Sequence, residues 1–90
     1  MQEEYRKFLS ELIKKQMVIL GPNLVLSKAR KIDGLKIGDD GEVAAIGRDP
    51  LDTFKEISGY FNDLSGHIAQ ITLERLLEKY PGLKQEIASS

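Results

Sequence analysis

The residue types that could support nucleophilic catalysis come closest together at residues 63–67. Asp63, Ser65 and His67 supply an acid, a hydroxyl and an imidazole, and His67 is the only histidine in the chain. The Gly-x-Ser-x-Gly turn that presents a nucleophilic serine is absent, and nearness in sequence does not create the geometry of a triad. Capping of a helix boundary explains Ser65 more simply. We therefore predict no catalytic site here and do not expect an enzyme.

A second group of chemically useful side chains is the acidic run Asp39, Asp40 and Glu42 in Gly-Asp-Asp-Gly-Glu. It lacks the alternating spacing and the distant glutamate of a calcium loop. One histidine and no cysteine leave too few ligands for a transition-metal site. The glycines around the run match neither of the common phosphate-binding loops. The run is therefore predicted to be a solvated hairpin tip, and no metal or cofactor is expected.

Residues 5–20 have the spacing of an amphipathic helix. Apolar side chains recur at intervals of three and four residues, which places them on one stripe. These side chains are Tyr5, Phe8, Leu9, Leu12, Ile13, Met17 and Leu20. Gly21-Pro22 then interrupts the helix, because proline has no N–H and its ring clashes with the preceding turn. We expect a second helix over residues 22–31, and one kinked helix over residues 3–31 stays open as the alternative.

Residues 35–46 predict the only sheet. Asp40-Gly41 is typical of a two-residue hairpin turn, in which both central residues have positive φ. Such a turn would place Ile37 opposite Ala44 and gather the apolar side chains on one face. The expected apolar face is Leu35, Ile37, Ala44 and Ile46. Because a two-stranded hairpin is marginally stable alone, this face must lie on helices or the edge must pair with another copy.

Two further helices follow the hairpin. Asp49 is a good N-cap and Pro50 a good first residue for a helix over residues 50–64. A last helix is predicted over residues 67–80, where apolar side chains again recur at helical spacing. Residues 83–90 are expected to form a C-terminal tail that frays or adds a short turn.

The predicted fold is therefore α+β and mostly helical, with two helical hairpins flanking a central two-stranded antiparallel β-hairpin in the order α-α-β-β-α-α. Residues 1–82 are expected to form a single small globular domain, because 90 residues are too few for two. The two helical pairs align loosely when Gly21 is set against Gly66. The sequence leaves open whether they are an internal duplication.

The charges argue against two classes of partner. Thirteen basic and 14 acidic side chains nearly balance, and no nucleic-acid-binding motif accompanies them, so a nucleic-acid partner is not expected. The apolar runs are far shorter than the roughly 20 residues that span a bilayer, so no membrane association is predicted. With no cysteine in the chain, we expect a cytoplasmic location.

The distribution of apolar and charged side chains favours association with another protein. The end of the helix over residues 5–20 is apolar most of the way round, and a small domain has few places to bury such a surplus. Residues 1–31 carry a net charge of +4 and residues 32–90 carry −5, so unlike halves of two copies could attract each other. Tyr60 cannot face the core together with its neighbour Phe61. The candidate interface residues are Met17, Val18, Leu20, Leu24 and Tyr60.

The predicted function is a non-catalytic protein-interaction or self-association module that acts by packing of apolar helix faces, with a homodimer or another protein as partner. The alternative is a domain that binds a small molecule or anion at the helix starts near Gly21-Pro22 and Ser65-Gly66, where backbone N–H groups are free.

The segment from Leu9 to Leu26, a helix that runs into ILGPNLVL, resembles short Gly-Pro-containing helical segments of uncharacterised prokaryotic domains, some of them attached to signalling proteins. The resemblance covers about a fifth of the chain, and its marked feature is Gly21-Pro22. It implies a prokaryotic source and supplies no catalytic or ligand-binding residue.

Overall fold

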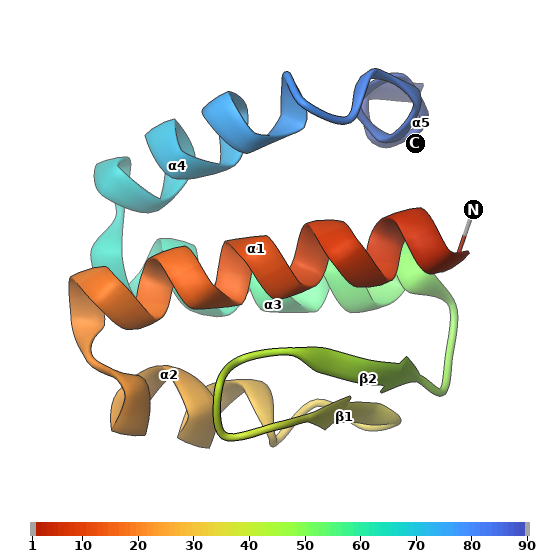
Figure 1. Ribbon diagram of the computed structural model, residues 1–90. Coiled ribbons are helices and arrows are strands. Elements are labelled where there is room, and N and C mark those ends of the chain that lie inside the picture. The colour runs from red at the N-terminus through yellow and green to blue at the C-terminus, as the bar shows by residue number, and fades with distance from the viewer. Residues whose placement is uncertain (1, 90) are drawn as a thin grey trace.

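The predicted order of two helices, a β-hairpin and two helices is confirmed, and a further helix follows (Figure 1). The structure is a computed structural model that describes residues 2–89. Its elements are α1 (Gln2–Leu20), α2 (Pro22–Ala29), β1 (Leu35–Ile37), β2 (Val43–Ile46), α3 (Pro50–Ser65), α4 (His67–Leu77) and α5 (Pro81–Ser89).

The helix α1 is the centre of the fold. Figure 1 shows α3 running alongside it, the hairpin and α2 on one side, and α4 with α5 on the other. Its predicted apolar stripe is buried from Tyr5 to Ile13, with Phe8 and Leu9 fully enclosed, whereas Met17 and Leu20 are partly buried. Ser10 and Gln16, which lie off that stripe, are buried too. The buried surface of α1 is therefore wider than one stripe, because three layers cover it.

The chain breaks cleanly at Gly21, so α1 and α2 are two helices and not one kinked helix. Gly21 has a φ of 91°, which L side chains rarely adopt, and its N–H donates to the Met17 carbonyl over 2.9 Å. Pro22 then takes the first position of α2. The helix α2 ends at Ala29, two residues earlier than predicted, and Ile32 in the following turn is buried.

The predicted two-residue hairpin turn is wrong. The Gly41 N–H donates to the Gly38 carbonyl over 3.0 Å and the Gly38 N–H to the Glu42 carbonyl over 2.9 Å, which closes a three-residue loop. Gly41 has a φ of 87°, whereas no other residue type within residues 2–89 has a positive φ. This is the loop in which a turn is followed by one left-handed residue.

The longer loop changes the register of the hairpin. Ile37 lies opposite Val43 rather than Ala44, and the pairing slips between Lys36 and Ile37. Val43 is consequently buried, whereas Ala44 is exposed. The predicted apolar face was therefore wrong at Ala44, because a bulge moves the alternation of side chains by one residue.

The hairpin is held by α1 along its outer edge as well as its apolar face. The Ser10 hydroxyl accepts the Val43 N–H over 2.9 Å, and Arg6 Nη1 donates to the Val43 carbonyl over 3.0 Å. Lys14 Nζ donates to the Glu42 carboxylate over 2.6 Å. Because α1 satisfies these groups, the hairpin needs no second copy for support.

The C-terminal third differs most from expectation. The Asp49 side chain accepts the Asp52 N–H over 3.0 Å, as an N-cap should, and α3 extends to Ser65. The helix α4 ends at Leu77, earlier than predicted, and Pro81 begins α5 instead of closing α4. The expected frayed tail is thus a helix, anchored by Leu83, which is fully buried.

Two glycine substitutions test this account of the fold. A Cβ at Gly41 would lie 2.7 Å from Met17 Sδ, whereas one at Gly59, within α3, would meet nothing within 4 Å. We expect Gly41→Ala to lower the free energy of unfolding by about 2 kcal/mol, through the left-handed φ and the clash. Gly59→Ala should raise it by about 0.5–1 kcal/mol. Urea denaturation measures both, and equal effects of the two changes would contradict this packing.

A pH titration tests the packing of α5 on α1. Burial, and then the carboxylate of Glu86 in α5, raise the pKa of Tyr5 from its ordinary 10.0 to about 12. The unfolded chain releases this proton near pH 10, so the contribution of neutral Tyr5 is complete below pH 10 and is lost as the pH rises towards 12. Tyr5→Phe should flatten this part of the stability profile. Urea denaturation at pH 9 and pH 11 measures it, and parallel profiles for both proteins would contradict the assignment.

Candidate interaction surface

The structure does not assemble the three residues with catalytic chemistry. The Ser65 hydroxyl lies 3.1 Å from Gln16 Oε1 and 3.1 Å from the Phe61 carbonyl, so it is engaged with the buried amide of α1 and with its own helix. Asp63 and His67 are exposed. Their side chains make no hydrogen bond with Ser65 or with each other in the part of the chain that is described. Ser65 acts here as a structural residue.

The acidic hairpin tip is likewise occupied by local contacts. Asp40 Oδ1 accepts the Glu42 N–H over 2.9 Å, and Asp39 pairs over 2.7 Å with Arg30, the residue directly after α2. Among residues 2–89, no group of three or more carboxylate or imidazole side chains is placed to hold a metal ion. No helix among the same residues combines the length and apolar content needed to cross a membrane.

The five predicted interface residues fall into two groups. Val18 is 87% exposed and Leu24 is 39% exposed. The other three pack partly buried against the core, and they are Met17, Leu20 and Tyr60. Leu24 lies on α2, which the break at Gly21 turns away from the line of α1 (Figure 1), and Tyr60 lies on α3.

Val18 instead shares a surface with α4. An open groove of about 350 Å³ is lined by Lys15, Val18 and Ile19 of α1 and by Thr72 and Arg75 of α4. Ile19 is 43% exposed. Ile68 and Ile71 of α4 are exposed by 52% and 37%. We call these seven residues together the α1–α4 surface.

The α1–α4 surface is charged at one end and apolar at the other. The helices α1 and α4 run in opposite directions (Figure 1). Lys15 lies one turn before Val18 and Ile19, and Arg75 lies one turn after Thr72. The two cations therefore lie at one end of the groove, and the exposed aliphatic side chains gather towards the other.

Arg75 differs from the other arginines in that it has no ion pair within the described residues. Within residues 2–89, Arg6 pairs with Glu3, Arg30 with Asp39 and Arg48 with Glu56, whereas Arg75 has no ion pair. Lys15 is also unpaired in this part of the chain. Arginine is one of the residue types enriched in protein interfaces.

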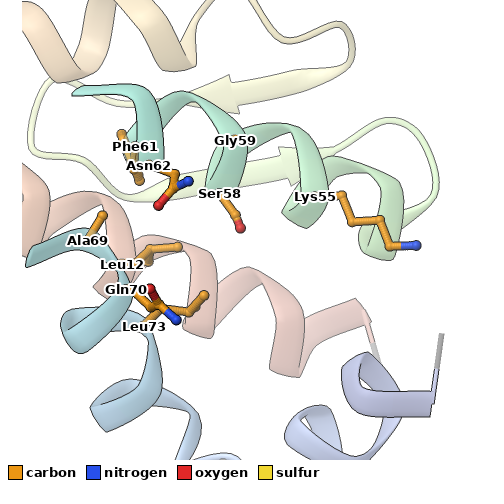
Figure 2. A pocket seen from close by; sticks show the side chains of 9 residues that line it. All are labelled: Leu12, Lys55, Ser58, Gly59, Phe61, Asn62, Ala69, Gln70 and Leu73. Atoms are coloured by element: carbon orange, nitrogen blue, oxygen red, sulfur yellow. The ribbon is translucent and has the colours of Figure 1, made fainter. Parts of the chain in front are cut away.

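A second groove lies on the other side of α4, between α4 and α3 (Figure 2). It has a volume of about 280 Å³, with an apolar floor that includes Leu12 and Leu73 and a polar lip of Ser58, Asn62 and Gln70. Gly59 opens its wall on α3. The helix α4 thus lies over α1 as a lone helix with a hollow on each side.

The sequence contained a signal for the α1–α4 surface that the predicted interface missed. Ile68 and Ile71 fall beside the buried stripe of α4, as Val18 and Ile19 do on α1. Sequence periodicity places such residues at the margin of a helix face but does not say which two margins meet. The predicted anion sites at the helix starts are not tested by this geometry and stay a prediction.

The comparisons with protein families, with curated proteins and with solved structures find no match to this chain. The residues of this chain are therefore the basis for its proposed function.

The structural role of Ser65 can be tested against a matched serine. Ser65→Ala removes a partner of the fully buried Gln16, whose Nε2 has no hydrogen-bond partner among the described residues. We expect it to lower the free energy of unfolding by about 1–2 kcal/mol. Ser58→Ala, at the lip of the second groove, should change it by less than about 0.5 kcal/mol. Urea denaturation measures both, and a neutral Ser65→Ala would contradict the assigned role.

Proposed function

We propose that this chain is a non-catalytic protein-interaction module that self-associates by packing apolar helix faces at the α1–α4 surface. The observation that carries the proposal is the exposure of Val18 at 87% and Ile68 at 52%, next to a groove that α1 and α4 form together. Contiguous apolar surface on a small domain typically marks an interaction site. The absence of cysteine fits the cytoplasmic, reducing setting that we propose for it.

The other apolar surfaces that were candidates for an interface are covered within the fold, which supports the choice of the α1–α4 surface. The hairpin was the other candidate, but its apolar face and outer edge are covered by α1 through Val43, Ser10 and Arg6. Met17 and Leu20 are likewise packed against the core. The surplus of apolar side chains that remains is therefore on α1 and α4, with Leu24 apart from it on α2.

Binding of a small molecule is the second candidate, and the α3–α4 groove favours it. An apolar floor beneath a few polar groups is the composition of ligand sites, and about 280 Å³ is close to their lower size limit. The hydroxyl of Ser58 and the amides of Asn62 and Gln70 would orient such a ligand (Figure 2).

Sedimentation equilibrium at micromolar concentration tests the first proposal. The protein should sediment above its protomer mass of 10.1 kDa. Val18→Asp should return it to that mass, since burying one valine contributes about 1.5 kcal/mol or more and a two-fold interface buries it twice. This corresponds to a loss of about 100-fold in dimer affinity.

Ser27→Asp is the matched control, because Ser27 is exposed on α2 and the change adds the same charge. It should leave the mass unchanged. A protein that stays at the protomer mass throughout the concentration series, or a Val18→Asp variant that associates as strongly as the unmodified chain, would overturn the proposal.

A further inference from the structure

The exposed side of α4 carries a pattern that matches the α1–α4 groove. Ile71, Glu74 and Glu78 are three and seven residues apart, so they lie on one stripe of the helix. All three are exposed. Within the described residues neither glutamate has an ion pair, although Lys84 of α5 lines the same shallow hollow. The stripe is therefore apolar towards the start of α4 and acidic towards its end.

The groove has the same order of polarity with the opposite sign of charge. Its aliphatic part lies at the start of α4, where Val18 and Ile19 are, and Lys15 and Arg75 lie towards the end of α4. A helix with apolar residues followed by carboxylates would match both parts. The described chain itself presents such a helix on its surface, and that helix is α4.

From this match, which rests on the proposed function, we propose that the α1–α4 groove is occupied by α4 of a second copy of this chain, running parallel to the first α4. The two copies are related by a two-fold axis along the helix direction. Each α4 then lies beside the other, and each fills the groove between α1 and α4 of its partner.

The two-fold axis determines which faces meet. Rotation about an axis along α4 turns the second helix over, so that its solvent-facing stripe points down onto α1 of the first copy. Ile71 of the partner subunit packs on Val18 and Ile19, and Glu74 of the partner subunit comes to Lys15. Ile68 and Arg75, seven residues apart on one side of α4, face the partner helix, where each meets its own counterpart.

Charge selects the parallel alignment over the antiparallel one. An antiparallel second α4 would place its carboxylates against Val18 and Ile19 and would leave Lys15 and Arg75 among aliphatic side chains. Charges buried without partners cost several times more than a rim ion pair contributes. The contact of Lys15 with Glu74 of the partner subunit thus sets the direction of association, whereas Arg75 is exposed and meets its own counterpart. The aliphatic side chains supply the strength of the association.

Single cysteines test the alignment directly, because the chain contains none. In the parallel pair each position on the facing side of α4 meets its own counterpart, so Ile68→Cys and Thr72→Cys should both give covalent dimers under mild oxidation. In an antiparallel pair only a central position such as Thr72 meets itself. Val18→Cys is the collision control, since the two α1 helices lie on opposite outer sides and its cross-linking should be slower by about tenfold or more.

A charge reversal supplies a second readout on the same dimer. Lys15→Glu should weaken dimerisation by about three- to tenfold, and Glu74→Lys combined with Glu78→Lys should weaken it similarly. All three changes together should restore most of the affinity. Lys7→Glu, an equal charge change at the opposite end of α1, should have little effect.

The outcomes separate the two proposals. A dimer that cross-links through Thr72→Cys alone, or whose reversed charges do not restore affinity, overturns the parallel pairing and leaves the interaction module intact. A chain that sediments as a protomer at all concentrations overturns both. Cross-linking at Ile68 and Thr72, with restoration by the triple reversal, is the expected result.

Discussion

The burial of one broad face of α1 is the constraint on which the rest of the structure depends. Phe8, Leu9 and Ile13 have no exposed surface, and neither does Gln16. A domain of 90 residues has little material with which to enclose a helix of 19 residues. The chain covers α1 with α3, with the hairpin and α2, and with α4 followed by α5. A lone helix cannot cover the full width of another, because two packed helices touch only where the ridges of one enter the grooves of the other.

The incomplete cover over α1 connects the fold to the proposed function. A groove remains on each side of α4 because this one helix does not cover the full width of α1. On one side it leaves Val18, Ile19 and Ile68 in water. On the other side it leaves the groove lined by Ser58, Gly59 and Asn62. The α4 helix of a second copy, placed in the first groove, would complete the layer over α1. Small chains commonly enlarge their core by forming such homo-oligomers.

The polar contacts of α1 show why the hairpin is not an open edge. Ser10 and Arg6 lie on the helix face next to the apolar stripe, and they take up the outward N–H and carbonyl of Val43. This contact needs Val43 at the position opposite Ile37, which the three-residue loop and the bulge provide. The turn therefore sets the register of the hairpin, and the register in turn allows α1 to cover the edge. Gly41 is its tightest point, because its backbone approaches Met17 and Lys14 of α1.

The sequence by itself determined the types and order of the elements from α1 to α4, an interruption at Gly21 and the cap at Asp49, because each of these follows from local backbone chemistry and from the period of apolar residues. The tertiary structure decided that Gly21 separates two helices and does not kink one. It did not determine the register of the hairpin, since one residue in the loop decides which of Val43 and Ala44 turns inward. It also did not show that residues 81–89 form a helix, because the burial of its anchor, Leu83, depends on how the chain packs in three dimensions. The tertiary structure decided which helix margins form the α1–α4 surface: periodicity locates the exposed margin of each helix, whereas the packing of α4 on α1 places Val18 in one groove with Thr72 and Arg75.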